Sequence, residues 1–224
     1  FLFLEVMRVA DILKPKIILI ENVKGILSMG GGTVKDEIVR ELEKRGYKTD
    51  YKVLNASQHG VPQKRERVFF IANKLGKDNI FPEHKKEVTN VGSVLNNIKG
   101  ENHEPRELKG ATLERVKLIK QGENWTSLPK KLQTKSVHSG AYGRINPNEP
   151  SRTLTTRFDT PSVGYVTHPY ENRTLTVREG ARIQTFPDSY VFRGNRMSQY
   201  RQVGNAVPVQ LASEVAKGIK KMLQ

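Results

Sequence analysis

Hydrophobic residues follow two different periods along the first part of the chain. Over residues 1–13 they recur at helical spacing, and Pro15 then closes the predicted helix. Four consecutive apolar residues, Ile17-Ile18-Leu19-Ile20, come next, most of them β-branched, and predict a strand buried on both faces. A helix that feeds such a strand indicates the start of an α/β layer.

A second helix and two further strands are predicted to follow. The turn Gly30-Gly31-Gly32 precedes apolar residues at helical spacing, and Thr33 is a candidate cap for a helix that ends near Gly46. Strands are predicted at residues 47–54 and 67–72. The glycine run does not have the spacing of a phosphate-binding motif, so a plain turn is the favoured interpretation.

The composition changes over residues 74–170, where Lys, Asn, Gly, Ser, Thr and Pro are frequent and apolar stretches are short. This pattern predicts a smaller, irregular module of short strands and long loops, of the kind that often forms a binding surface. Regular structure is predicted to return after residue 171, with a short helix from Thr176 and a C-terminal helix that begins close to Pro208. The chain therefore combines a regular α/β part with an irregular one.

The charge of the chain favours a polyanionic partner. Its 224 residues include 38 Lys and Arg against 23 Asp and Glu, which gives a formal net charge of +15. In a folded chain this excess favours nucleic acid as the partner, and basic charge that serves only solubility is the alternative. Residues 138–160 interleave Arg144, Arg152 and Arg157 with Thr, Ser and Tyr, a mixture suited to phosphates and base edges.

Several kinds of site are excluded by the residue types. The chain has no cysteine, so it can supply no disulfide, no zinc-thiolate site and no cysteine nucleophile. Its five histidines are scattered without ligand spacing, and the sequence predicts no metal site. No stretch has the length and apolar character of a membrane span or a secretory signal, so we expect a cytoplasmic protein. Because the chain begins at Phe1 inside an apolar helical pattern, we also expect a fragment of a longer protein.

Candidate chemistry lies beside two of the predicted strands. Glu21 follows the first strand, at the end where open parallel sheets form their ligand crevice. Arg65 and Arg67 lie at the start of a later strand, and guanidinium groups at a sheet rim can fix a base carbonyl or a phosphate. Alternatively, Glu21 is an ordinary loop carboxylate and one of the arginines pairs with Glu66. If the strand already includes Arg65, the two arginines share a face and Glu66 points away from it.

Four short motifs follow one another along the chain: Glu21-Asn22-Val23, QKRER at 63–67, RTLTVRE at 173–179 and GNAVP at 204–208. In this order they resemble the Glu-Asn-Val motif, the Gln-x-Arg-x-Arg motif, the segment after the target-recognition domain and the last motif of the DNA (cytosine-5) methyltransferases of bacterial restriction-modification type. Each motif is weak by itself, but four in the family's order make coincidence very improbable. The family's glycine-containing cofactor loop and its Pro-Cys nucleophile motif have no counterpart in the chain.

The resemblance implies a fold and a division into domains. The fold would be α/β, with part of the Rossmann-like sheet of the S-adenosylmethionine-dependent methyltransferases and a smaller, irregular target-recognition domain. Residues 1–73 would be the remainder of the catalytic domain and residues 74–170 the DNA target-recognition domain. Residues 171–224 would return to the catalytic domain and end in its C-terminal helix.

The resemblance also implies a reaction, the transfer of a methyl group from S-adenosylmethionine to carbon 5 of a cytosine flipped out of double-stranded DNA. In the family a cysteine thiolate attacks carbon 6, and a carboxylic acid relieves the negative charge by protonating ring nitrogen 3. Glu21 would be that acid, with a pKa raised by the pocket that closes around the base. Arg67, and Arg65 beside it, would orient the pyrimidine carbonyl.

Cofactor contacts are implied at four positions. Leu2 and Phe186 would pack against the adenine, Asn205 would bind the polar end of the cofactor, and Val207 would also touch it. Without a cysteine we expect the chain to be inactive alone and to need a missing N-terminal segment or a partner subunit that carries the Pro-Cys motif. Two alternatives stay open: a noncatalytic DNA-recognition subunit of a split methyltransferase, and a basic nucleic-acid-binding protein with no enzyme history.

Overall fold

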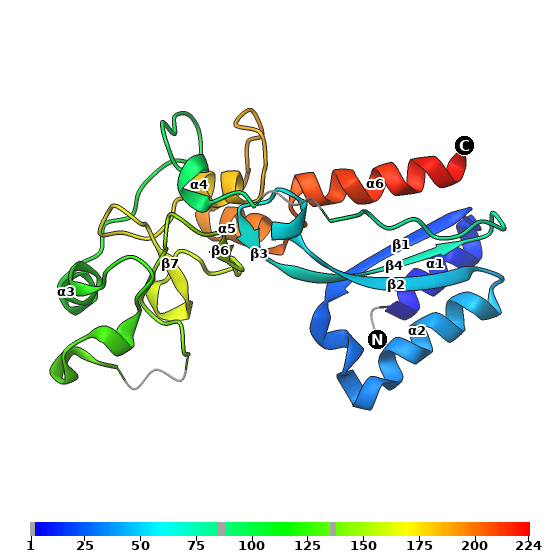
Figure 1. Cartoon of the computed structure of the whole chain (residues 1–224), viewed down its shortest axis with the longest axis horizontal. Helices are drawn as coiled ribbons and strands as arrows, with labels where there is room; N and C mark the ends of the chain where they lie inside the picture. The colour runs from blue at the N-terminus through cyan, green and yellow to red at the C-terminus, as the bar shows by residue number, and fades with distance from the viewer. Residues whose placement is uncertain (1–2, 85–87, 135–137) are drawn as a thin grey trace. The chain divides into compact units, whose positions relative to one another are not determined.

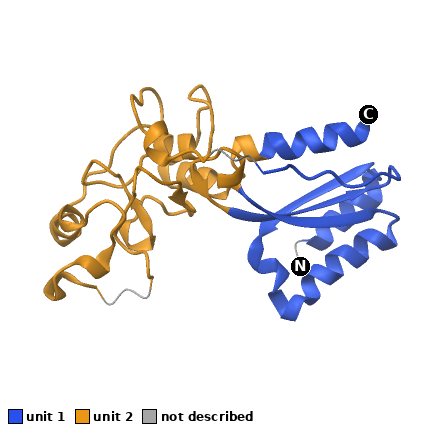
Figure 2. Ribbon diagram, viewed as in Figure 1, with its two compact units in different colours: residues 1–55, 66–84, 212–224 blue, residues 56–65, 85–211 orange. Residues whose placement is uncertain are grey.

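The chain forms two compact units, each assembled from segments that are distant in the sequence. In this computed structural model, residues 3–84, 88–134 and 138–224 are described (Figure 1). Unit 1 consists of residues 1–55, 66–84 and 212–224, and unit 2 consists of residues 56–65 and 85–211 (Figure 2). We describe the units separately.

A three-stranded sheet is the centre of unit 1. Its strands are β1 (Ile17–Val23), β2 (Lys48–Asn55) and β4 (Glu66–Asn73), arranged in the order β1-β4-β2. Both outer strands pair antiparallel with β4, so β1 and β2 run in the same direction without touching each other. The strands predicted at residues 47–54 and 67–72 are confirmed to within one residue. The strand predicted at residues 17–20 extends to Val23, so Glu21 lies inside it and not after its end. The parallel pairing expected for this sheet is not what these strands form.

The buried strand of unit 1 is β4 and not β1. Every residue of β4 from Val68 onward is buried, because strands flank it on both sides. In contrast, β1 lies at an edge, and Leu19 on it is 44% exposed. The expectation that the apolar run 17–20 is buried on both faces is therefore wrong, since an apolar run does not distinguish a central strand from an edge strand.

Two helices cover one face of this sheet. They are α1 (Phe3–Leu13) and α2 (Thr33–Lys44), and their buried side chains pack with alternate residues of β1 and β4. The prediction for α2 is confirmed, although Gly32, with a positive φ of 97°, holds the N-cap position in place of Thr33. For α1 the helix is confirmed, and its buried face contains Phe3, Met7 and Ala10, whereas the apolar Val9 is 41% exposed. Beyond residue 211, helix α6 (Val209–Leu223) belongs to unit 1.

Unit 2 has little regular structure. Its strands are two or three residues long and form two parallel pairs, β3 with β6 and β5 with β7. The segments are β3 (Gln63–Lys64), β5 (Gly143–Arg144), β6 (Ser151–Arg152), β7 (Tyr165–Thr167), α3 (Gly110–Leu118), α4 (Val177–Ile183) and α5 (Arg196–Asn205). Short 3-10 turns supplement them at η3 (Ala56–His59), η4 (Val91–Val94), η5 (Trp125–Ser127), η6 (Lys130–Leu132) and η7 (Pro161–Val163), and unit 1 has two more at η1 (Lys24–Leu27) and η2 (Met29–Gly32).

The boundaries of the two units differ from those of the domains that the family resemblance implies, and that division into domains stays a prediction. Residues 171–211 lie with unit 2, whereas residues 171–224 were expected to return as a whole to the first domain. The physical reason is a shared apolar core: Leu175, Val177 and Val203 pack in one cluster with Ile145 and Val166 from the irregular module. A change of composition along the chain does not show which segments bury their side chains together.

Helix length sets one further limit on the fold. Among the helices of the described ranges, none combines the length and the apolar character needed to cross a bilayer.

Candidate functional site

Glu21 and Arg67 form an ion pair on one face of the unit 1 sheet. In the β1–β4 register Val23 lies opposite Arg67, so Glu21 is the diagonal neighbour of that arginine, and such neighbours lie on the same face within reach of long side chains. The Arg67 Nε lies 3.0 Å from the Glu21 Oε1. Side-chain exposure is 27% for Glu21 and 14% for Arg67, so the pair sits at a partly buried rim. The two residues that the sequence singled out are thus brought together by strand pairing.

The remaining contacts of Arg67 leave part of its guanidinium available. Its Nη1 donates a hydrogen bond of 2.8 Å to the main-chain oxygen of Glu66, and Nη2 has no hydrogen bond to any described residue. Burial lowers the pKa of Arg67, and the Glu21 carboxylate opposes that shift. The Glu66 side chain accepts instead from Lys24 Nζ at 3.1 Å. The alternative in which Glu66 takes an arginine into a side-chain ion pair therefore does not describe Arg67.

Arg65 lies in a different environment. It lies between β3 and β4 and belongs to unit 2, so the condition for sharing a strand face with Arg67 is not met. Its side chain is 1% exposed, and it donates to the main-chain oxygens of Leu154 at 3.1 Å and Gly204 at 2.9 Å. The expectation that Arg65 joins Arg67 at the base carbonyl is corrected: its donors hold backbone within unit 2.

Arg144 is also committed to the fold, contrary to the prediction of a DNA contact. Its side chain is buried, and burial lowers its pKa. It donates five hydrogen bonds, to the main-chain oxygens of Val116, Ile119, His168 and Glu171 and to the side chain of Asn172. A guanidinium with so many protein acceptors has no donors to spare for a phosphate.

Arg152 and Arg157 remain exposed, as a DNA contact requires. The Arg152 guanidinium lies 3.9 Å from the ring centroid of Tyr165, a cation–π contact that fixes the side chain at the surface. Beside it is a hollow of about 320 Å³, lined in part by Lys64, Arg152 and Thr153. Arg157 donates to Asp159 and Thr160, and its exposed guanidinium lines a second hollow of about 600 Å³.

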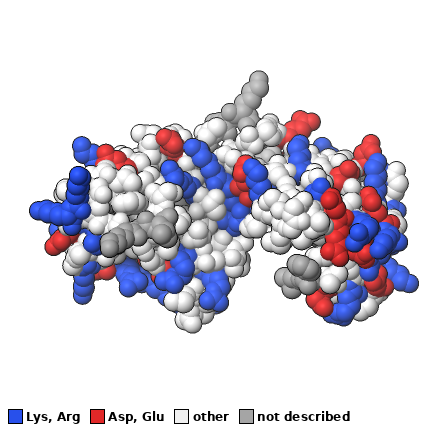
Figure 3. Space-filling model, turned by 90° about the horizontal axis from the view of Figure 1, so that it is seen from below, with Lys and Arg blue, Asp and Glu red and all other residues white. Residues whose placement is uncertain are grey.

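Most of the positive charge lies in unit 2, which has twice as many basic as acidic residues. In unit 1, acids lie among the basic side chains on the face shown in Figure 3, and several form pairs such as Glu41 with Lys44 and Arg45. Those two cations lower the pKa of Glu41 to about 2. The net charge of the chain therefore describes unit 2 better than unit 1.

The four residues predicted to bind the cofactor differ in their burial and surroundings. Leu2 lies outside the described residues. Phe186 is half-buried and packs against Tyr190 at a ring-centroid distance of 5.1 Å. Asn205 is exposed at the last position of α5, and Val207 lies half-buried in the turn that follows. Gln184, two residues before Phe186, donates to the main-chain oxygens on either side of Asn205, so Phe186 and Asn205 belong to neighbouring segments.

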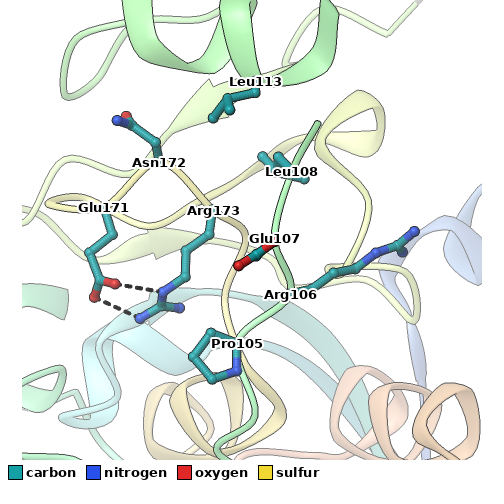
Figure 4. A pocket seen from close by; sticks show the side chains of 8 residues that line it. All are labelled: Pro105, Arg106, Glu107, Leu108, Leu113, Glu171, Asn172 and Arg173. Carbon is teal, nitrogen blue, oxygen red and sulfur yellow. Dashed lines mark hydrogen bonds and ion pairs between the residues drawn. The ribbon is translucent and has the colours of Figure 1, made fainter. Parts of the chain in front are cut away.

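A cluster that the sequence did not predict lies in unit 2, and one member, Glu171, lines a hollow of about 350 Å³ together with Arg173 (Figure 4). His168, Glu171 and Glu179 bring their ligand atoms within 4.8 Å of one another, as metal ligands do. Arg173, however, donates to both carboxylates at 2.7 and 2.8 Å, so a guanidinium occupies the place of a cation. Burial opposes ionisation of Glu179, yet hydrogen bonds from Arg173 and Thr176 outweigh it and lower the pKa of this carboxyl.

The cluster supports the start of α4. Thr176 accepts a hydrogen bond from the Glu179 amide, and the Glu179 carboxylate accepts from the Thr176 amide, which is a complete capping box. The short helix predicted from Thr176 is confirmed, and the spacing Thr-x-x-Glu at 176–179 is a signal that could have identified its cap in the sequence. No sequence signal pairs Glu179 with His168, because the turn that brings them together is formed by tertiary contacts.

Comparison with known proteins agrees with this arrangement of motifs. The family model for the C-5 cytosine-specific DNA methylases matches residues 1–221. The chain is 37% identical over 231 residues to the type II methyltransferase M1.HphI of Haemophilus parahaemolyticus, covering 99% of this chain and 61% of that protein. It is 36% identical to M.NgoFVII of Neisseria gonorrhoeae, covering 97% of this chain and 62% of the relative. The chain thus spans about three fifths of the length of these relatives.

Solved structures show the same fold at low sequence identity. A putative DNA modification methyltransferase encoded within an Escherichia coli prophage superposes with a TM-score of 0.77 at 22% identity, covering 99% of this chain and 74% of that one. The Dnmt2 methyltransferase of S. pombe superposes with a TM-score of 0.69 at 19% identity, covering 99% of this chain and 72% of that one. With a family model that matches nearly every residue and relatives that align along the whole chain, this protein belongs to the C-5 cytosine-specific DNA methylase family.

Proposed function

We propose that this chain is the C-terminal part of a type II DNA cytosine-5 methyltransferase, which transfers a methyl group from S-adenosylmethionine to carbon 5 of a flipped cytosine in a specific DNA sequence. The observation that carries the proposal is the Glu21–Arg67 pair at 3.0 Å, formed between two motifs that are distant in the sequence. Family membership identifies the class of reaction, and the pair supplies the groups that this reaction needs for a pyrimidine ring.

Glu21 would protonate ring nitrogen 3 of the cytosine while Arg67 holds the ring in place. In the absence of DNA the two side chains form an ion pair in which the Glu21 Oε1 accepts no hydrogen bond, so this oxygen stays available for a base. The Nη2 group of Arg67, which bonds to no described residue, would donate to the pyrimidine carbonyl. Protonation and carbonyl binding both neutralise negative charge that develops on the ring, which lowers the barrier to attack at carbon 6.

The residues of unit 2 fit a nucleoside-containing cofactor. Phe186 presents a partly exposed ring suited to an adenine face, and Asn205 offers an exposed amide at the end of α5. Val207 adds an apolar side chain in the same turn. S-adenosylmethionine would supply the methyl group when bound. This chain would contribute binding and orientation at that site.

DNA would be held by the exposed basic side chains of unit 2. Arg152 and Arg157 keep their guanidinium groups at the surface beside hydroxyl-bearing residues such as Thr153, and these groups suit phosphate oxygens and base edges. Arg144 is not part of this surface because its donors bind the protein. We propose that residues of the irregular module read the target sequence.

The cysteine nucleophile would come from outside residues 1–224, because this chain has none. Its source would be an N-terminal segment or a partner subunit with the Pro-Cys motif. The edge strand β1, with the exposed apolar side chains Leu19 and Val23 on one face, offers a place for further strands to pair. A second candidate function, a noncatalytic recognition subunit of a split methyltransferase, is favoured by the same absence of cysteine.

The test is Glu21→Gln in the protein as its gene encodes it, with transfer of labelled methyl groups to DNA as the measurement. Glutamine keeps the shape but cannot act as the acid, so kcat should fall by about a hundredfold or more while DNA affinity stays within a few fold. Glu37→Gln, at a partly exposed carboxylate on α2, is the matched control and should leave kcat unchanged. Full activity of Glu21→Gln would refute the assignment.

Residues 1–224 alone should transfer no methyl group, and activity of this purified segment without a partner would contradict the proposed source of the nucleophile. Addition of a second polypeptide that contains the Pro-Cys motif should restore transfer in the split case. DNA affinity of the segment should also fall steeply with salt, because basic side chains displace counterions from phosphates. A salt-independent affinity would contradict phosphate binding by unit 2.

A further inference from the structure

The turn that carries Asn205 is held by three side chains from two other segments of unit 2. We propose that Gln184, Arg65 and Thr185 are positioning residues that fix the turn between α5 and α6 in a cofactor-binding conformation. The inference rests on the proposed function, because it assumes that Asn205 and Val207 touch S-adenosylmethionine. Its physical basis is a set of hydrogen bonds that saturates the end of one helix and the start of the next.

Gln184 bonds the turn on both sides of Asn205. Its side chain is fully buried, and its Nε2 donates to the main-chain oxygens of Val203 at 2.9 Å and Ala206 at 3.4 Å. Both partners are acceptors, so the amide nitrogen must face them. The last carbonyls of a helix have no partners within the helix, and here one side chain takes two oxygens at the end of α5.

Arg65 takes the oxygen between them. Its Nη2 donates 2.9 Å to the Gly204 oxygen, and its Nη1 donates to the Leu154 oxygen, so the turn is tied to the segment after β6. Gly204 lies against that segment: a Cβ built on it would come within 2.4 Å of the Thr155 oxygen. The close approach requires glycine in this position. The close approach lets the single Arg65 guanidinium reach the carbonyls of both Gly204 and Leu154.

Thr185 fixes the other end of the turn. The Val209 amide donates to the Gln184 oxygen at 3.0 Å and the Gln210 amide donates to the Thr185 Oγ1 at 2.9 Å, so the first amides of α6 are satisfied by these two residues. Thr185 has a φ of 59°, which is rare for a β-branched residue. Such strain persists only where surrounding contacts enforce it, and it frequently marks a functional site.

These contacts leave Asn205 exposed while the backbone around it is immobilised. The oxygens of Val203, Gly204 and Ala206 all accept from buried side chains, whereas the Asn205 side chain has no hydrogen bond to any described residue. A ligand that binds this turn does not need to order it first, which reduces the entropic cost of binding. The motif residue Arg65 therefore acts through the turn and not on the base.

The experiment is Gln184→Glu in the protein as its gene encodes it. Glutamate has the same size, but it places a second oxygen where Nε2 donates, and only one oxygen of a protonated carboxyl could donate to the two carbonyls. The dissociation constant for S-adenosylmethionine, measured by calorimetry, should rise at least tenfold, while DNA affinity changes less than threefold. Gln199→Glu is the matched control, because the exposed Gln199 amide also donates to a main-chain oxygen, that of Gly194.

Amide hydrogen exchange provides a second readout that does not depend on the cofactor. In Gln184→Glu the amides of Ala206, Val209 and Gln210 should exchange at least tenfold faster, and those of β4 in unit 1 should exchange as in the wild type. Equal losses of cofactor and DNA affinity would indicate a merely structural role and overturn the inference, as would unchanged exchange in the turn. If the wild type binds no S-adenosylmethionine, the proposed function fails, and hydrogen exchange alone decides the inference.

A milder variant covers the case in which Gln184→Glu does not fold. Thr185→Val keeps the β-branched shape and removes the acceptor for the Gln210 amide. The affinity for S-adenosylmethionine should fall about threefold to tenfold, with faster exchange at Gln210. Thr185→Ser restores the hydroxyl and should recover most of the affinity for S-adenosylmethionine and most of the slow exchange at the Gln210 amide. No rescue by serine, or no effect of valine, would overturn the role of Thr185.

Discussion

The two units of this protein are stabilised in different ways. Unit 1 buries aliphatic and aromatic side chains between a sheet and two helices, and its backbone polar groups bond within strands and helices. Unit 2 has an apolar core as well, but its long loops leave many main-chain oxygens without a partner in regular structure. Buried arginines supply the missing donors, most completely at Arg144 and Arg178.

This difference changes what a basic composition means. An arginine offers five donors in a rigid fork, so one side chain can satisfy carbonyls from several loops at once. Arg65, Arg144 and Arg178 are each less than a tenth exposed and bond main-chain oxygens, although Arg65 and Arg144 were predicted from the sequence to contact nucleic acid. In unit 2, therefore, an arginine indicates DNA binding only if its side chain is exposed.

The largest expected effect comes from removing an arginine of unit 2. Arg144→Met should lower the free energy of unfolding by about 3 to 5 kcal/mol, because each buried carbonyl left without a donor costs about 1 to 3 kcal/mol. Urea unfolding followed by the fluorescence of Trp125, the one tryptophan of the chain, would report on unit 2. Arg201→Met, at an exposed position on α5, is the control. A loss below about 1 kcal/mol for Arg144→Met would remove the distinction between the units.

Truncation of a buried aliphatic side chain tests the apolar packing that stabilises unit 1. Ile38→Ala removes a fully buried side chain of α2 and should cost unit 1 about 2 to 4 kcal/mol through lost burial and the cavity left behind. Hydrogen exchange at the amides of β4 would detect it, with Ile12→Ala, at a 67% exposed position of α1, as the control. Equal acceleration of exchange in α4 of unit 2 would show that the units do not differ in their response.

The smallest expected effect is a dependence on pH confined to unit 2. Burial lowers the pKa of His168 below its ordinary value of 6.5, and its Nδ1 accepts hydrogen bonds from the amides of Tyr170 and Glu171. The unfolded chain therefore binds a proton on this histidine at a higher pH than the folded one. Stability is greatest above about pH 6.5 and falls as the pH drops below it.

His168→Asn tests this dependence. Asparagine retains an acceptor for the two amides but cannot be protonated, so the decline between pH 7 and pH 5 should be smaller than in the wild type. Unfolding monitored by Trp125 fluorescence at a series of pH values would measure it. The variant and wild type are compared at pH 8, where the histidine is neutral in both states. An identical decline in the variant would assign the dependence to other groups.

The predictions made from sequence succeeded where the signal is local. The helix at Thr33–Lys44, the helix that begins after Thr176 and the strands of unit 1 follow from side-chain period and helix-start residues, which depend on near neighbours. Glu21 and Arg67 were identified by the motifs that contain them, and pairing of β1 with β4 places them together. Their roles in catalysis stay predictions.

The sequence by itself determined the family, the class of the fold and the residues whose chemistry fits a pyrimidine. Only the tertiary structure decided that β4 and not β1 is the buried strand, that Arg65 and Arg144 serve the backbone, and that Gln184 holds the turn beside Asn205. Burial and hydrogen-bond partners of an arginine or a glutamine are set by segments far away in the chain. A local pattern of residues therefore does not predict the burial or the hydrogen-bond partners of these side chains.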